Sequence, residues 1–320
     1  MKRFLAILTV LAVVLVAFAA CGGGSATTMT MGTGGTQGTY YAYGGILGNQ
    51  IKSATGITVN VVSTDGSKAN ILGIDTGNYQ LGTVQSDVMA YAAEGSRTFE
   101  AEGAIDSFRV IGGLYAEAVQ LITMDPAIKS VADLKGKKVS IGAAGSGVYF
   151  NAVDVLAAAG LTEDDIKPQY QSFGDSADAL KDGKIDAAFI VAGAPTPAIQ
   201  ELCTSANAYL VPIDGEVAEK LMETSPYYTV YEVPAETYNG QTEAVKTVTV
   251  KATLIVSAAA AEEDVYNITK AIFDNAEAIA ATHAKGAELS IENATSGMTA
   301  PFHAGAARYF AEQGVEVEVE

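Results

Sequence analysis

Strand-like and helix-like segments alternate along most of this 320-residue sequence. Short apolar or β-branched runs, such as 57–63 and 81–85, are separated by longer helix-like runs and by turns of Gly, Ser, Thr and Asp. Such alternation is typical of a mostly parallel sheet covered by helices. The sequence therefore predicts an α/β fold with mixed, mostly parallel sheets flanked by helices.

The same order of elements occurs twice. The first copy consists of a strand at 29–34, a small-residue loop at 35–39, a helix to Lys52, a strand at 57–63, a capped helix ending at Gly77 and a strand at 81–85. The second copy consists of the strand 138–142, the loop 143–147, the helix 148–159, the strand 169–173, a helix capped by 174–176 and ended by Gly183, and the strand 187–191. We interpret this repetition as two similar lobes.

Two extended segments, 108–124 and 245–257, connect the predicted lobes, and helices at 262–282 and 304–313 complete the first one. Two crossings of this kind make a two-strand hinge. The predicted boundaries are 29–122 together with 250–320 for lobe 1, and 123–249 for lobe 2.

The N-terminus is typical of an exported protein. Lys2 and Arg3 precede an apolar run at 4–18, which is shorter than the roughly 20 residues that span a bilayer. Ala19 and Ala20 then precede Cys21, as in the lipobox of bacterial lipoproteins. We therefore predict a lipoprotein signal peptide at 1–20, lipidation of Cys21, and a flexible tether at 21–28. The protein is expected outside the cytoplasm, anchored to the cell membrane through its lipid.

The charge and the cysteines narrow the function further. With 19 basic and 37 acidic residues, the net charge of −18 argues against nucleic acid and against an anionic bilayer face as partners. Cys203 is the one cysteine after Cys21, so no internal disulfide is expected, and we interpret it as a buried small apolar residue. His283 and His303 lie in a remote segment, and no cluster has metal-ligand spacing.

Three glycine-rich segments resemble catalytic motifs but depart from them. In 32–38, Gln37 stands where a dinucleotide fingerprint has its last glycine. Residues 66–68 lack the upstream glycine of a phosphate-binding loop, and 145–147 is not the Gly-x-Ser-x-Gly elbow of hydrolases. We therefore predict no enzymatic activity, no cofactor and no metal.

The candidate binding residues lie where predicted strands end and helices begin. Ligands of open α/β sheets bind at such ends. Helix starts at 35–40, 66–70 and 145–148 offer free backbone N–H groups and a positive dipole end to a carboxylate or phosphate. No arginine lies in these loops, so recognition is expected through N–H groups and hydroxyls. The candidate ligand contacts are Thr36, Gly38, Thr39, Tyr40, Tyr41, Ser67, Asn70, Gln85, Asp87, Ser146, Gly147, Gly193 and Tyr228.

Several of these residues have a purely structural alternative. Ser67 and Ser146 are also candidate helix N-caps, and Asn70 and Gln85 could satisfy loop backbone groups. One of the clustered tyrosines near Tyr40 is expected in the core.

Six segments resemble those of TAXI proteins, the TRAP-associated extracytoplasmic immunogenic solute receptors. They are Gly34-Gly35-Thr36-Gln37-Gly38-Thr39-Tyr40-Tyr41, Ser63-Thr64-Asp65-Gly66-Ser67-Lys68-Ala69-Asn70, Gln85-Ser86-Asp87, Asp133-Leu134-Lys135-Gly136-Lys137-Lys138-Val139, Gly145-Ser146-Gly147 and Pro226-Tyr227-Tyr228. The resemblance covers nearly the whole mature chain. It implies a monomeric receptor with a type II periplasmic-binding-protein fold that delivers solute to a TRAP membrane permease, made of fused small and large subunits and driven by an ion gradient.

The resemblance also implies a carboxylate or amino-acid ligand similar to glutamate, glutamine or 2-oxoglutarate. Asp65 stands where the family has glycine, and its charge disfavours a second carboxylate nearby. Two other functions stay open: a solute-binding lipoprotein of an ABC importer or sensor system, which shares the fold, and an exported hydrolase.

Overall fold

The computed structural model describes residues 27–319. The predicted signal peptide, Cys21 and residues 21–26 of the predicted tether lie outside the described residues, and the first strand already begins at Thr28. The strands are β1 (Thr28–Gly32), β2 (Thr58–Val62), β3 (Leu81–Gln85), β4 (Phe108–Thr123), β5 (Lys138–Ser140), β6 (Lys167–Gln169), β7 (Ala187–Ala192), β8 (Tyr209–Val211), β9 (Thr229–Val233) and β10 (Val245–Ser257).

The helices lie between these strands and after the last one. They are α2 (Thr39–Thr55), α3 (Ser67–Asp75), α4 (Ser86–Glu94), α5 (Gly147–Ala158), α6 (Phe173–Lys181), α7 (Pro197–Ser205), α8 (Gly215–Thr224), α9 (Glu262–Phe273), α10 (Ala276–Ala280), α11 (Ile291–Thr295), α12 (Ala304–Glu312), and the 3₁₀ helices η1 (Arg97–Phe99), η2 (Val131–Leu134), η3 (Glu163–Asp165) and η4 (Ala284–Glu288). Within 27–319, no helix is both long and apolar enough to cross a membrane.

The strands form one mixed sheet in the order β2-β1-β3-β10-β4-β7-β5-β6, with β8 beside β4 and β9 beside β10. β1 is parallel to β2 and β3, and β5 is parallel to β6 and β7. Each of these triplets then meets a long antiparallel strand, β10 for the first and β4 for the second. The predicted α/β class is confirmed, and the strand plan occurs twice.

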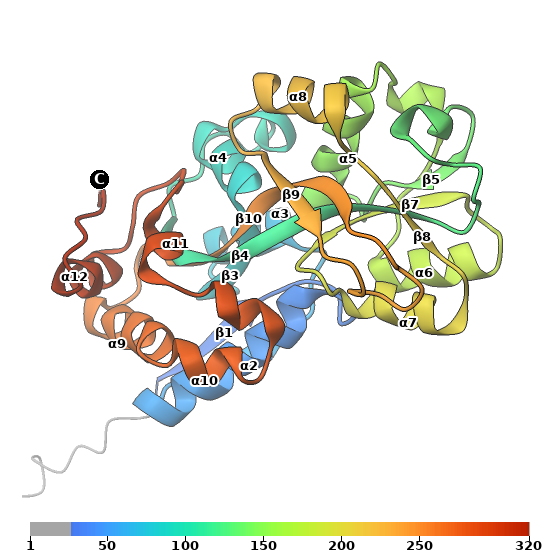
Figure 1. The fold of residues 1–320 in the computed structure, drawn as a ribbon. Helices are drawn as coiled ribbons and strands as arrows, with labels where there is room; N and C mark the ends of the chain where they lie inside the picture. Colours follow the sequence, from blue (N-terminus) through green and yellow to red (C-terminus); the bar gives the residue numbers. More distant parts are fainter. Residues whose placement is uncertain (1–26, 320) are drawn as a thin grey trace, which may run out of the picture.

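The long strands β4 and β10 belong to both halves of the sheet. They pair antiparallel with each other, and the pairing register shifts between Ala252 and Thr253 and again between Leu254 and Ile255. Such irregularities bend a strand locally. Figure 1 shows β4 running between two groups of helices, with α2, α9 and α10 on one side and α5, α6 and α7 on the other.

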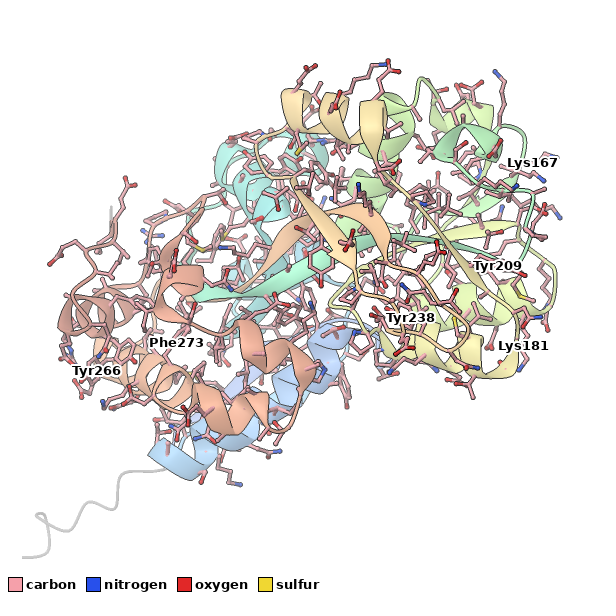
Figure 2. The ribbon with its side chains drawn as sticks, viewed as in Figure 1. Lys167, Lys181, Tyr209, Tyr238, Tyr266 and Phe273 are labelled. Carbon is pink, nitrogen blue, oxygen red and sulfur yellow. The ribbon has the colours of Figure 1, made fainter. Side chains whose placement is uncertain are left out.

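Buried apolar side chains gather around each half of the sheet. One core cluster draws on residues 29–115 and 252–310, with Phe150 as its single contribution from the intervening chain. Two further clusters lie within 118–250. We call residues 29–115 together with 252–310 the first region, and residues 118–250 the second region. Tyr266 and Lys167 mark their opposite ends in Figure 2. The predicted lobe boundaries follow a similar division and stay a prediction.

The predicted bounds are wrong at two places, the start of α6 and the break between α9 and α10. The strand predicted at 169–173 ends at Gln169, and α6 begins at Phe173 with Ser172 as its cap, whose Oγ accepts from the Asp175 N–H at 3.2 Å. The single helix predicted at 262–282 is broken into α9 and α10, and the Asn275 side chain, between the two helices, donates to the Ala271 carbonyl. Local side-chain bonds of this kind compete with helix and strand backbone pairing.

Candidate ligand-binding site

A cavity of about 80 Å³ lies at the carboxyl ends of the parallel strands, between the two regions. It is smaller than the roughly 150 Å³ cavity that takes up benzene. The first region contributes Gly34, Gly35, Gly38, Thr39, Tyr40, Thr64, Asp65, Gly66, Ser67 and Gln85. The other lining residues are Glu117, Ala143, Ser146, Gly147, Val148, Gln171, Ser172, Phe173, Val191 and Ala192.

Three of the helices that begin at the cavity, α2, α3 and α5, have no acidic residue in the first turn. Two others, α4 and α6, have caps that line the cavity, Gln85 and Ser172, and contain Asp87 and Asp175 in their first turns. Acidic side chains usually compensate the positive end of the helix dipole and its free N–H groups. At α2, α3 and α5 the first turn provides no such compensation.

The two predicted capping serines do not cap their helices. Ser67 is already the first residue of α3, and its Oγ accepts instead from the Gln85 N–H at 3.1 Å. Ser146 occupies the cap position of α5 without a side-chain cap bond, and its buried Oγ has no partner among the described residues. A buried hydroxyl without a partner is costly, so Ser146 is available to a ligand.

Gln85 connects the cavity to the opposite region. Its Nε2 donates to Asn151 Oδ1 at 3.0 Å, and its Oε1 has no partner among the described residues although the side chain is buried. A Cβ on Gly147 would lie 1.6 Å from this Oε1, so Gly147 lets the amide approach the backbone of α5.

Glu117 is the functional candidate that the sequence analysis missed. It lies on β4 with its side chain in the cavity lining, 2% exposed, and Tyr40 Oη donates to its Oε2 at 2.6 Å. Burial raises the pKa of the Glu117 carboxyl to about 8, although the bond from Tyr40 opposes this rise. The available signal was a single charge in the otherwise uncharged run 110–124.

Six predicted ligand contacts lie outside the cavity lining, and four of them, including Asp87, belong to the first region. Thr36 is exposed on the loop before α2, and Tyr41 is half-buried on that helix. Asn70 donates to the carbonyls of Thr33 and Thr83, and its Oδ1 accepts from Thr64 Oγ1, so its polar atoms are engaged within the fold.

The remaining three contribute to contacts between the regions. The Gly193 carbonyl accepts from Thr39 Oγ1 at 2.8 Å. Asp87 and Tyr228 both accept from Asn151 Nδ2 at 2.8 Å. Burial raises the pKa of Asp87 to about 7. The residues that do line the cavity are Gly38, Thr39, Tyr40, Ser67, Gln85, Ser146 and Gly147.

An ion pair also joins the two regions. Arg97 places both terminal nitrogens on the Asp154 carboxylate, at 2.7 and 3.1 Å. Its guanidinium also lies over the rings of Tyr91 and Phe150. Arg97 has a φ of 53°, a left-handed conformation that is strained for this residue type. The regions are therefore held against each other in this conformation.

We also looked for metal ligands and for a reactive thiol among the described residues. No group of three or more His, Cys, Asp or Glu side chains within 27–319 could hold a metal ion. Cys203 is a buried free cysteine in a core cluster of the second region, and burial raises the pKa of its thiol.

The sheet order and the cavity between two regions define the fold of periplasmic solute-binding proteins. The alkanesulfonate-binding protein SsuA from Xanthomonas axonopodis pv. citri, bound to MOPS, is similar with a TM-score of 0.52, 18% identity and coverage of 90% of this chain and 85% of that one. A protein of Bordetella bronchiseptica RB50 is similar with a TM-score of 0.54 and 18% identity, and the match covers 89% of each chain. A putative L-cystine ABC transporter from Listeria monocytogenes is similar with a TM-score of 0.51 and 16% identity, and the match covers 82% of this chain and 98% of that one.

A family match is more specific than these structural likenesses. The NMT1-like family matches residues 31–314, so the chain belongs to that family. This match does not show whether the chain is a TAXI receptor. The resemblance to TAXI receptors therefore stays a proposal.

Proposed function

We propose that this protein is an extracytoplasmic receptor that encloses a small solute between its two regions and delivers it, chemically unchanged, to a membrane transporter. One observation carries the proposal. Gln85 in the first region and Ser146 in the second both line one cavity, and each has a buried polar atom, Oε1 and Oγ, without a partner among the described residues. A ligand that bonds both would favour the conformation in which the regions touch.

The contacts across the cavity support a receptor that opens and closes. Thr39, Gln85 and Arg97 all bond across to the second region, while β4 and β10 connect the two regions continuously. The register shifts near Ala252 and Leu254 offer a place for the strands to bend. We propose that the regions rotate about this point, as hinged lobes with boundaries near those expected from the sequence.

Ligand binding is tested by calorimetry and thermal unfolding on residues 21–320 with Cys21→Ser. A ligand present at 100 times its Kd stabilises the fold by about 2.7 kcal/mol. We expect such stabilisation from a small amino acid or carboxylate, and recovery of the ligand unchanged after incubation. Conversion of the ligand into a product would instead support the hydrolase alternative.

The favoured partner is an ABC-type importer, because solved proteins with this fold include a putative L-cystine ABC transporter component. A TRAP permease is the second candidate, supported by the segments 34–41, 85–87 and 226–228 that resemble TAXI receptors. Uptake into membrane vesicles supplied with this receptor distinguishes them. Dependence on ATP supports the importer, and dependence on an ion gradient without ATP supports the permease.

A location outside the cytoplasm and an anchor at Cys21 complete the proposal, on the evidence of the N-terminal sequence. Mass spectrometry of the protein extracted from membranes tests both. We expect the chain to begin at Cys21 and to have a diacylglyceryl mass increment. A Cys21→Ser variant should lose this increment and leave the membrane fraction.

A further inference from the structure

The side chains around the cavity offer hydrogen-bond acceptors and no cation. Gln85 Oε1 and Gln171 Oε1 are buried acceptors without partners among the described residues, and Glu117 adds a buried carboxyl. No Lys, Arg or His occurs among the described residues that line the cavity. Lys285, which is buried nearby, is paired with Glu288 at 2.6 Å. Dehydrated acceptors are stabilised by a donor, and a charged donor is the strongest.

A chain of hydrogen bonds fixes which atom Gln85 presents. Asp87 Oδ2 accepts from Asn151 Nδ2, so Asn151 Oδ1 is left to accept from Gln85 Nε2. Gln85 Oε1 is then the acceptor left without a partner among the described residues, and it lies against Gly147 at the start of α5. Asp87 is in this sense a positioning residue, although it lies outside the cavity lining.

Donors also occur in the cavity lining. The N-termini of α3 and α5 have free N–H groups there, and the unpartnered Ser146 Oγ lies at the second of them. The cavity therefore combines donors at helix starts with an acceptor side at Glu117, while Gln85 Oε1 lies against Gly147 at the start of α5.

We propose that the ligand is a zwitterion, such as an α-amino acid or a small aminosulfonate, whose protonated amine contacts Glu117 while its anionic group lies at the starts of α3 and α5. This inference rests on the proposed receptor function and narrows it. Oxo acids and dicarboxylates without an amine leave the acceptor side unsatisfied and bind weakly.

Ligand pairs that differ only at the amine test the proposal by calorimetry. Suitable pairs are L-glutamate with 2-oxoglutarate, L-alanine with pyruvate, L-leucine with 4-methyl-2-oxopentanoate, and taurine with isethionate. In the pair that fits the cavity, we expect the amine to bind at least about 100-fold more tightly than its partner, as for other buried charge-assisted contacts.

The variant Glu117→Gln keeps the shape of the side chain and removes its charge. It should weaken binding of the amine about 10- to 100-fold and leave the weak binding of the oxo or hydroxy partner within about threefold. Glu201→Gln, at an exposed position on α7, is the matched control and should change neither affinity.

A second measurement needs no variant. Tyr40 from α2, Asp87 from α4 and Lys285 from η4 face Glu117, with Tyr115 beside it on β4. Because the pKa of Glu117 is about 8 before binding, an ammonium group that ionises it at pH 7 releases roughly one proton. Calorimetry in two buffers of different ionisation enthalpy measures this release, which would support the amine contact, whereas proton uptake on binding would overturn it.

The possible failures are distinguishable. If an oxo or hydroxy acid binds as tightly as its amine partner, Glu117 acts as a protonated donor and the amine proposal is overturned, while the receptor function stands. If no pair binds, mass spectrometry of solute released from the purified protein decides. A released solute without an amine overturns the amine proposal alone, a released amine supports it, and the lack of any solute contradicts the receptor function itself.

Discussion

The two regions share a strand plan but present different chemistry to the cavity. After corresponding strands, the first region places Tyr40, Ser67 and Gln85, whereas the second places Val148, Phe173 and Ala192. The first region therefore holds most of the polar groups that can recognise a ligand. The second region contributes small and apolar surface that excludes water, together with the polar side chains of Ser146, Gln171 and Ser172. Similar folding thus produces one region that recognises the ligand and one that encloses it.

The largest expected effect is that of pH on stability. Asp87 is a buried carboxyl of the first region, and Glu117 is a buried carboxyl that accepts a hydrogen bond from that region. The pKa of Glu117 is about 8 in the folded state and that of Asp87 is about 7, both above their unfolded values. The folded state thus binds more protons between pH 5 and 8, so stability falls as pH rises through this window. We expect the free energy of unfolding in urea to fall by on the order of 4 kcal/mol.

The double variant Asp87→Asn with Glu117→Gln removes both carboxyls at nearly constant volume. It should flatten the pH dependence between pH 5 and 8. An unchanged slope in this variant would assign the effect to general repulsion among the acidic surface residues.

Gly147→Ala tests the close approach of the two regions. The added methyl group would lie 1.6 Å from Gln85 Oε1, so the regions cannot close without moving that side chain. Overpacking of this kind costs about 1–3 kcal/mol, and we expect about 10- to 100-fold weaker ligand binding by calorimetry. Gly45→Ala, where no atom lies within 4 Å, is the control and should leave binding unchanged. Equal affinity of both variants would show that closure does not require a glycine at 147.

Arg97→Ala tests whether the ion pair with Asp154 favours the closed arrangement. The pair is half-buried and bidentate, so we expect a loss of about 1 kcal/mol, or about fivefold in ligand affinity, together with a larger radius of gyration without ligand. Lys184→Ala removes an exposed ion pair with Asp182 and should change neither quantity. If the radius of gyration stays constant, the ion pair does not control closure.

The smallest expected effect is that of Thr39→Val, which removes one bond across the cavity. The Gly193 carbonyl would still accept from Thr196 Oγ1 at 3.0 Å, so it is not left without a partner. We expect at most about threefold weaker binding, measured by calorimetry. A loss beyond tenfold would indicate that the Thr39 hydroxyl contacts the ligand directly.

The sequence predicted strands better than site geometry. The bounds of β3 and β10 agree with the prediction, because turn residues flank each apolar run. By contrast, Phe173 was placed at the end of the predicted strand 169–173, although it begins α6 and lines the cavity. Local patterns report burial, and they do not distinguish burial in a core from burial beside a ligand.

The sequence predicted which loops form the site, but it did not predict the hydrogen bonds that their side chains make. Seven of the thirteen predicted contacts line the cavity, and the remaining six lie elsewhere in the fold. Asn70 and Asp87 were chosen for their chemistry, but their partners come from distant segments that a single sequence does not pair. Glu117 was missed for the same reason, since its bond to Tyr40 links positions 77 residues apart.

The second region is one continuous stretch of chain, whereas the first region is assembled from both sides of it. A chain that emerges N-terminus first has released the whole second core by Val250, while β3 still awaits Ala252–Val256. Domains generally fold in the order in which they are synthesised. The enclosing region can therefore fold before the recognising one, and the cavity between them is formed only when β10 completes the sheet.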